Sequence, residues 1–585
     1  MRSTLIKLST FSITALLLAS NVVASEAKLA LTADILSTNP GVNRDDNTDG
    51  VLLNVVEGLV GDGEGGTVKP LLAKSVDVSQ DGLTYTFKLR DDVKFHDGGS
   101  FSSADAMWNW QRYTDPATKW RCLPDIDGTN GLKVTAAEAP DAGTFVLHIN
   151  KPSALFLDTL ARTDCGGTAI LSKASLNSDG TWSKPIGTGP YSIQDWKKGQ
   201  SVTLAKFAEY KSPEGTGFDG YVGDKTPHVD TVTFVVVPDA ATMKAALLAK
   251  IIDVAQALTS DVAELKEQKG IVVLTPSDAS KHAILFQTND PLFKDGKFRQ
   301  AIVAALDLQQ LVGFASDGLS EPSSSAVFGA SPYNDDVQKK SFQYDLTKAN
   351  ELLAQSSYKG QTLKLIANKR GPMPSSQVAL VAQSMLQAVG IKVEIQTLEW
   401  AAQLEKYNSG DYQLMSFSYS SRLDPALSFD QFAGDKTKQP RKVWDNPAAL
   451  ALIAKAKTTA DVAERKKIFD ELHEMMLADA PLVILYNGLT AWAYQDRLQN
   501  FTPWEGKPRL WGMTVNRKTR PTTTGGSRRA SLFLKEALVV DPDRTSGRYQ
   551  RFCADTTDPR RSSAAHSGGP CDAGNAERDA SAAGP

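Results

Sequence analysis

Apolar and polar residues alternate in several short stretches of the chain. Alternation places every second side chain on one face, as in a strand with one buried side. The pattern predicts strands over residues 28–35, 83–90, 144–150 and 231–237; the first is KLALTADI and the last is the β-branched run TVTFVVV.

Other stretches repeat apolar residues every three or four positions, which is the spacing of one helix face. They predict helices over residues 103–113, 239–250, 298–312, 346–355, 375–390 and 463–480. Strands and helices alternate from residue 25 to residue 518 without an internal repeat. A chain of 585 residues is too long for one compact core, so we expect two to four α/β or α+β domains.

The first 24 residues differ from this pattern. Arg2 and Lys7 give a positive start, Phe11 to Ala19 are mainly apolar, and small residues precede Ser25. This is typical of a cleaved secretory signal peptide over residues 1–24, too short to span a membrane. No cysteine lies near the cut, so no lipid anchor is expected, and no later run predicts membrane insertion.

The end of the chain differs in composition. Residues 1–518 carry 40 Lys and 14 Arg, whereas residues 519–585 carry 1 Lys and 9 Arg. The segment 518–585 is also rich in Ser, Ala, Gly, Pro and Thr, and it buries too little apolar surface to offset its ordering entropy. It predicts a disordered tail outside the folded protein, either a natural extension or the product of a frameshift or read-through.

Charge and motifs exclude several functions. The formal net charge of −3 offers no basic excess for a nucleic-acid partner. The sequence has no G-x-S-x-G elbow and no Walker loop. His473 in HEMM lacks the second histidine of a zinc protease helix and is expected at the surface. We therefore expect no catalytic residues, no metal, no cofactor and no enzyme activity.

Cys122 and Cys165 lie in the folded part of an exported chain, where a disulfide is permitted. Their spacing fits no zinc site. We predict that they pair, with two free thiols as the alternative.

Several ordered segments resemble one known family. They are KPLLAKSVDVSQDGLTYTFKLRDDVKFHDGGSFSSADAMWNW (69–110), PIGTGPY (185–191) followed by Trp196, FKDGKFRQAIVAALD (293–307), FQYDLTKANELLAQSSYKG (342–360) and DAPLVILY (479–486). They resemble the peptide/nickel type of solute-binding protein that feeds ABC importers, bacterial extracellular family 5. Their Asp-Gly and Gly-Thr-Gly elements are turn residues, so they identify the fold and leave the cargo open.

The resemblance implies a two-lobed α/β periplasmic-binding-protein fold with an additional inserted domain. Lobe I would comprise residues 25–57, 182–280 and 488–517, the insert 58–181, and lobe II 281–487. A small molecule or short peptide would bind between the hinged lobes of a periplasmic monomer, which would then dock on an inner-membrane ABC permease.

The stretch FSYSSRLDP (417–425) is the predicted lining of the pocket. In peptide-binding members, an aspartate four residues before the proline pairs with the peptide amino group; here that position is Ser421. Arg370 resembles the family's carboxylate-binding arginine, and Asp34 stands where members place an acidic cleft residue. The resemblance thus implies ligand-binding roles for Asp34, Arg370, Tyr419, Ser421, Arg422 and Asp424.

These residues leave the cargo open. The fold favours a dipeptide or oligopeptide, but hydroxyls beside an arginine also suit an anionic or sugar-like solute, such as an opine or a sugar-phosphate. Ordinary free-amine peptides would then bind weakly, unless Asp34 supplied the countercharge. Arg422 could instead simply pair with Asp424. A periplasmic chaperone that grips unfolded chains is a third possibility.

The tail composition leads to a first prediction. Truncation after Lys518 should leave the melting temperature and ligand binding unchanged, because residues 519–585 are not expected to pack on the body. Differential scanning calorimetry of both forms checks this. A drop of more than a few degrees in the truncated form would show that the tail packs on the folded part.

Overall fold

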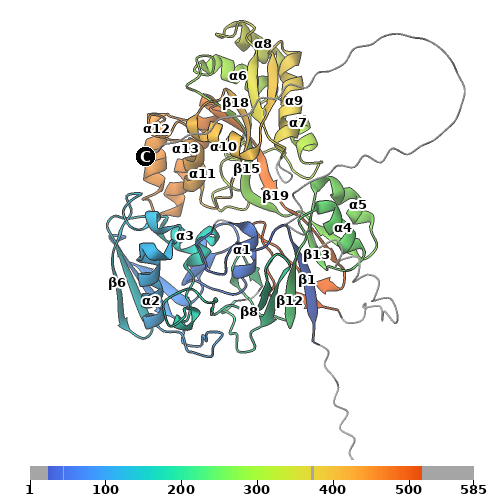
Figure 1. The fold of residues 1–585 in the computed structure, drawn as a ribbon. Coiled ribbons are helices and arrows are strands. Elements are labelled where there is room, and N and C mark those ends of the chain that lie inside the picture. The colour runs from blue at the N-terminus through green and yellow to red at the C-terminus, as the bar shows by residue number, and fades with distance from the viewer. Residues whose placement is uncertain (1–23, 44, 216, 370–373, 517–585) are drawn as a thin grey trace, which may run out of the picture. The chain divides into compact units, whose positions relative to one another are not determined.

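The computed structural model describes residues 24–43, 45–215, 217–369 and 374–516, which form three main sheets with their helices (Figure 1). The predicted signal peptide and tail lie almost wholly outside these residues. No helix in the described part combines the length and apolar character needed to cross a membrane.

The first sheet has seven strands, whose residues fall within the three segments predicted for lobe I. Its order is β14 (Ile271–Leu274), β20 (Ala491–Gln495), β13 (Val254–Ala257), β1 (Glu26–Leu31), β12 (Thr231–Val236), β9 (Ser201–Lys206) and β8 (Tyr191–Lys197). β1 pairs in parallel with β12 and β13, and the other pairs are antiparallel. Its helices are α1 (Asp46–Leu52), α4 (Ala240–Leu248) and α5 (Val262–Glu267). Two short antiparallel pairs, β10 (Phe218–Asp219) with β11 (Val222–Gly223) and β21 (Leu498–Gln499) with β22 (Thr514–Val515), lie in the same predicted segments.

The second sheet lies in the segment predicted for the insert. It is antiparallel, in the order β4 (Ala73–Val78), β5 (Thr84–Leu89), β7 (Thr144–Ile149) and β6 (Val134–Asp141). The helices α2 (Ser103–Thr114) and α3 (Phe156–Ala161) and the hairpin β2 (Val60–Asp62) to β3 (Val68–Pro70) accompany it. Phe87 and Phe145 of this sheet are fully buried, as the alternation predicts.

The third sheet, of lobe II, has the order β17 (Val393–Thr397), β16 (Leu363–Ala367), β18 (Leu414–Tyr419), β15 (Ser277–Phe286) and β19 (Leu482–Leu489). Side chains of β15 alternate between two cores: Ala283 and Leu285 enter one, Ile284 and Phe286 the other. One core is covered by α6 (Gly296–Ala305), α7 (Leu308–Ala315), α8 (Leu346–Ala354) and α9 (Ser375–Ala388). The other is covered by α10 (Trp400–Ser409), α11 (Pro425–Phe432), α12 (Pro447–Ala456) and α13 (Val462–Asp479).

Three predictions about local structure are wrong. The helix predicted over 298–312 is two helices, because Leu306 is extended and Asp307 caps α7 by accepting from the backbone N–H of Gln310. β1 ends at Leu31, so Asp34 lies outside the strand. His473 is fully buried, not exposed, and its Nε2 lies 2.9 Å from the Lys340 carbonyl oxygen.

One antiparallel ribbon joins the first sheet to the third. Leu274 of β14 pairs with Trp492 of β20, Thr490 donates its backbone N–H to the Pro276 carbonyl oxygen over 3.2 Å, and Ser277 of β15 pairs with Leu489 of β19. The two crossings between the segments of lobe I and lobe II are therefore hydrogen-bonded to each other, and this ribbon is where the hinge implied by the resemblance would lie.

The ribbon contains a bulge directly beyond the crossing. Residues 278–280 of β15 face only Gly488 of β19, between the pairs Ser277–Leu489 and Lys281–Asn487. A Cβ on Gly488 would lie 2.0 Å from Ser280 Oγ, so no other residue fits there without a shift. Bulges of this kind bend a strand and redirect its groups.

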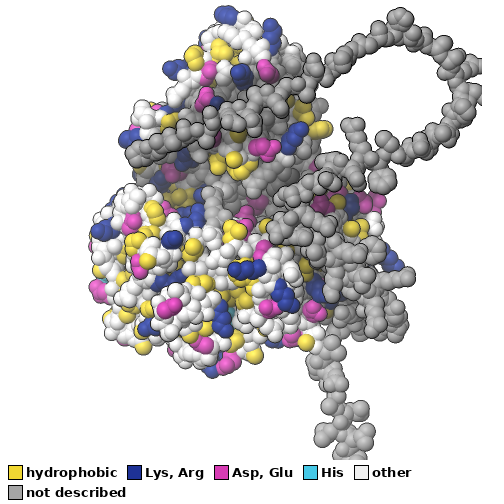
Figure 2. Space-filling view, viewed as in Figure 1, with side chains coloured by type: hydrophobic (Ala, Val, Ile, Leu, Met, Phe, Trp, Pro, Cys, Tyr) yellow, Lys and Arg dark blue, Asp and Glu magenta, His cyan; other side chains and the backbone are white. Residues whose placement is uncertain are grey.

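Surface charge is mixed. On the face shown in Figure 2, Lys and Arg side chains are interspersed with Asp and Glu side chains over the described residues. This agrees with the small net charge and gives that face no basic patch.

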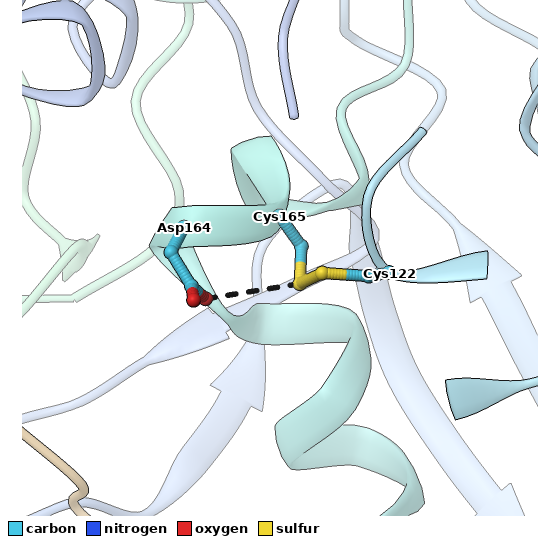
Figure 3. A group of neighbouring side chains, drawn as sticks. All are labelled: Cys122, Asp164 and Cys165. Atoms are coloured by element: carbon cyan, nitrogen blue, oxygen red, sulfur yellow. Dashed lines mark hydrogen bonds between the residues drawn. A yellow bond between two sulfur atoms is a disulfide. The ribbon is translucent and has the colours of Figure 1, made fainter. Parts of the chain in front are cut away.

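The predicted disulfide is present in the structure between Cys122 and Cys165, whose Cα atoms are 5.8 Å apart (Figure 3). Both cysteines are buried in the core of the insert. The Asp164 carboxylate lies 3.8 Å from Cys165 Sγ. Since the two sulfurs bond to each other, this trio has no thiolate to offer a metal.

The disulfide gives a second prediction. Replacing both Cys122 and Cys165 with Ser should lower the free energy of unfolding of the insert by ~4 kcal/mol, because the bridge closes a loop of 43 residues. Chemical denaturation of both forms measures this. Intact-mass analysis of native protein after alkylation, with and without reduction, is the control; two freely alkylated thiols without reduction would contradict the pairing.

Candidate ligand-binding cleft

A two-residue turn of lobe I carries Glu505. Trp504 and Lys507 exchange backbone hydrogen bonds of 3.0 Å in both directions, and Glu505 and Gly506 between them have φ of +47° and +71°. Positive φ at both central positions is typical of a hairpin turn. Gly506 adopts it easily, whereas Glu505 is an uncommon residue for this conformation.

Ser421 of lobe II meets this turn. It lies two residues after β18, where the chain leaves the sheet toward α11. The Ser421 hydroxyl donates to Glu505 Oε2 over 2.5 Å, so this hydrogen bond crosses from one lobe to the other.

The bulge in the hinge completes the surroundings of Glu505. It turns the Ala279 backbone N–H toward Glu505 Oε2, at 3.2 Å. Next to it, the buried Lys281 Nζ donates to the Ala279 carbonyl oxygen over 2.8 Å and to Ser428 Oγ over 3.2 Å. Burial lowers the pKa of Lys281 to about 8.

Glu505 itself is incompletely satisfied. Its Oε1 atom is buried and has no hydrogen-bond partner, and no lysine or arginine in the described part of the chain lies within ion-pair distance of the carboxylate. Burial, and then the charge of Asp278, raise the pKa of Glu505 to about 7. The carboxylate therefore sits in a place that disfavours its charge.

Two further carboxylates behave in the same way. Asp49 of α1 and Asp62 of β2 are buried and form no ion pair with any described residue. Burial raises the pKa of each to about 7; the charge of Glu505 adds to the effect at Asp62, and that of Lys507 opposes it at both. The charge of Glu505 thus acts on Asp62, and the charge of Lys507 acts on both Asp49 and Asp62.

Other contacts join the insert to lobe II. A Cβ on Gly66, in the β2–β3 turn, would lie 3.0 Å from Leu423 Cβ. The Ala154 backbone N–H of the insert donates to the Lys457 carbonyl oxygen of lobe II over 2.9 Å. Both the insert and lobe I thus contact the surface of lobe II that carries residues 421–424.

A pocket opens beside the hinge. It has a volume of about 230 Å³ and polar and apolar lining from the hinge strands and from the segment after α7: Thr275, Ser277, Leu319, Ser320, Glu321, Ser323, Phe328, Gly329, Asn487 and Leu489. Ser277 begins the bulge that also reaches Glu505. The volume of the pocket is below the roughly 300–1,000 Å³ of typical ligand pockets, and its lining includes neither Glu505 nor Ser421.

Two residues predicted to bind ligand form hydrogen bonds within their own lobes. Asp424 is buried, accepts two hydrogen bonds of 2.9 and 2.8 Å from Arg465 Nη2, and caps α11. Its salt bridge is therefore with Arg465. Asp34 accepts from Trp196 Nε1 at 3.0 Å and from the Gly199 backbone N–H at 2.7 Å, which fixes the turn between β8 and β9.

The remaining predicted residues differ in their environments. The Tyr419 ring is buried and lies against Phe417 and Phe432 in a lobe II core. Arg422 is half-buried and donates from Nη1 to the Ser421 carbonyl oxygen over 2.7 Å. Arg370 lies outside the described residues. Of the predicted set, Ser421 contacts a carboxylate of lobe I, and Arg422 lies beside Ser421.

Sequence reasoning missed Glu505. The only signal was WEGK (504–507), where a glycine at the second central position fits a two-residue turn. Nothing in that pattern says that the turn meets residue 421, which is 84 positions away in the sequence.

Comparison with known proteins identifies the family to which the chain belongs. Residues 67–440 match the family described as "Bacterial extracellular solute-binding proteins, family 5 Middle". The chain is 28% identical over 468 residues to the oligopeptide-binding protein AppA of Bacillus subtilis (strain 168), covering 74% of this chain and 81% of that protein. It is 27% identical over 507 residues to the glutathione-binding protein GsiB of Pectobacterium atrosepticum, covering 84% and 94%.

Solved structures share the fold. That of the binding protein AgaA of A. tumefaciens R10 in complex with agropinic acid has a TM-score of 0.64 and 26% identity, covering 84% of this chain and 98% of AgaA. That of a putative peptide-binding protein AppA from Clostridium difficile has a TM-score of 0.72 at 22% identity, covering 84% and 100%.

The buried carboxylates lead to a third prediction. The pKa of Asp62 is higher in the folded protein than in the unfolded chain, so its contribution to stability is present below about pH 4 and is lost as pH rises through about 7. Replacing Asp62 with Asn should therefore raise the free energy of unfolding at pH 8 by up to ~4 kcal/mol relative to wild type, and raise the melting temperature with it. At pH 4.5 the substitution should change both little.

Melting curves from pH 4.5 to 8 measure this difference. Asp336→Asn, at an exposed position of lobe II, is the matched control and should follow wild type at every pH. A difference between Asp62→Asn and wild type that does not change with pH would show that Asp62 is not a buried, unpaired acid.

Proposed function

Since the chain belongs to family 5 of the bacterial extracellular solute-binding proteins, a class of binding proteins and not of enzymes, we propose that it captures a peptide-class solute between its lobes for ABC import. The cargo would be a dipeptide, an oligopeptide or a peptide-like zwitterion, which the protein delivers to an inner-membrane permease. Capture shifts the population toward the form with the lobes in contact.

One observation carries this proposal: the cleft holds unpaired charge of both signs at a hinge. Glu505, Asp49 and Asp62 are carboxylates without an ion pair among the described residues, while Lys281 is a buried lysine that donates only to uncharged oxygens. A peptide carries an ammonium and a carboxylate, so it can complement both kinds of group.

The names of the relatives support the same cargo class. The two sequence relatives compared above are named for binding an oligopeptide and glutathione. We infer by this likeness, and by the charges of the cleft, that peptides are the first class to test.

A non-peptide acid is the second candidate. It is favoured by Ser421 and Arg422 standing together at the cleft, and by the likeness to AgaA, whose structure holds agropinic acid. A hydroxyl beside a guanidinium suits a carboxylate or a polyhydroxylated solute.

Cargo identification is the fourth prediction. Protein secreted into the periplasm and purified by gel filtration should carry one small solute, seen by native mass spectrometry and released on unfolding, with the mass and fragments of a short peptide. Adding that solute at ~100 times its Kd should stabilise the fold by ~2.7 kcal/mol.

Other results would change the assignment. A released acid without peptide bonds would favour the second candidate. Co-purification with unfolded proteins, and no small solute, would indicate a chaperone. The peptide proposal would be contradicted if the purified protein retained no solute and di- to pentapeptides did not shift its melting temperature.

A further inference from the structure

We propose that Glu505 receives the ammonium group of the captured solute, as a specificity-determining residue of the lobe I side of the cleft. This inference rests on the proposed function. Glu505 would replace the missing carboxylate at position 421 with one supplied from the opposite lobe.

The hydrogen-bonding capacity of the Glu505 carboxylate is not fully used. Oε2 accepts from the Ser421 hydroxyl and from the Ala279 backbone N–H, whereas Oε1 accepts from no described residue although it is buried. A buried carboxylate oxygen without a donor is costly, and in a native structure it calls for an explanation. A donor carried by the solute provides one.

The lack of a close cation at the site favours a cationic donor. Glu505 has no lysine or arginine within 4 Å among the residues the structure describes. Of the more distant charges, that of Asp278 raises its pKa more than that of Lys507 lowers it. A neutral donor would satisfy the hydrogen bond but leave the charge buried. An ammonium satisfies both, and a charge-assisted bond is about twice as strong as a neutral one.

Ser421 can take part in the same contact. Its hydroxyl proton is used toward Glu505, which leaves the lone pairs of its oxygen as acceptors. An ammonium has three donors, so one N–H can reach Glu505 Oε1 while another reaches Ser421 Oγ. The cation would thereby bind to both lobes at once.

The backbone of the turn supports a functional role for the side chain. Glu505 has φ of +47°, in a turn where Asn, Asp or Gly is the usual residue. Strained backbone of this kind persists mainly where the surrounding structure and function require it. Ring and backbone contacts hold the turn: Tyr221 donates its hydroxyl to the Trp504 carbonyl oxygen over 3.1 Å.

The alternative role for Glu505 is a simple latch, in which its bond to Ser421 holds the lobes together whatever the solute. A latch would affect all cargo equally, whereas an ammonium receptor would affect only cargo with a free amine. The two roles are therefore separated by comparing solutes that differ only in that group.

The experiment, our fifth prediction, uses two probes, a mixture of random tripeptides with free amino termini and the same mixture N-acetylated. The full-length secreted protein is first freed of bound solute by unfolding and refolding. Each mixture is then dialysed to equilibrium against it, and the peptides that the protein retains are quantified by mass spectrometry. Wild type should retain the free-amine mixture ~10-fold or more over the acetylated one. Glu505→Gln should reduce free-amine retention by ~10- to 100-fold and leave the acetylated mixture unchanged.

Two further variants sharpen the test. Glu474→Gln, which removes a surface partner of Lys340 in lobe II, is the matched control and should retain both mixtures as wild type does. Adding Ser421→Asp to Glu505→Gln returns a carboxylate to the cleft from the other lobe and should restore part of the free-amine preference. Melting curves verify that every variant is folded.

Several results would overturn the inference. Equal retention of the two mixtures by wild type, or an equal loss of both in Glu505→Gln, would leave Glu505 as a latch and the peptide proposal intact. If refolded wild type melts cooperatively but retains neither mixture, the peptide cargo itself is rejected, and the ammonium role with it.

Discussion

The whole arrangement depends on one hydrogen-bonded ribbon that crosses between the lobes twice in the same place. Because Thr490 donates to the Pro276 carbonyl oxygen at the crossing, the two connections cannot move independently. Any relative motion of the lobes is then a bend or twist of this ribbon. The bulge at residues 278–280, opposite Gly488, sets the direction in which the ribbon continues and turns the Ala279 N–H toward the cleft. Hinge and site are built from the same few residues.

Buried charged groups differ in whether they have an ion-pair partner. Within lobe I, Glu57 and Lys225 form a buried pair at 2.8 Å, and Glu57 also accepts from the Tyr210 and Thr188 hydroxyls. The Asp424–Arg465 pair of lobe II is satisfied in the same manner. At the cleft, by contrast, Glu505 and Asp62 are buried without an ion pair among the described residues. These two pairs inside the lobes are thus satisfied, whereas the two carboxylates are not, and this contrast supports the proposed ligand site.

The sequence predicts much of the fold because local rules decide it. Period-2 alternation finds β5, β7 and β12 to within a residue or two, since one face of each strand is buried. It fails where a capping group outweighs periodicity: Asp307 begins a new helix inside a continuous apolar repeat.

The site is predicted less well, because it joins distant segments. Ser421 could be found by resemblance, but its partner Glu505 belongs to another lobe, and the buried pairing of Asp424 with Arg465 depends on packing that no local pattern encodes.

The position of the carboxylate has a consequence for selectivity. A solute shifts the equilibrium between open and closed lobes only through contacts that differ between the two forms. A carboxylate at position 421 would bind an ammonium from lobe II alone, with similar strength whether or not lobe I is near. With the carboxylate on Glu505 and the hydroxyl on Ser421, the ammonium completes its contacts only when the lobes meet.

Converting a 1:99 population to 99:1 needs ~5.5 kcal/mol of differential binding. A charge-assisted bond made only in the closed form contributes a large share of that difference, so dividing the anchor between the lobes links recognition of the amine to closure of the cleft.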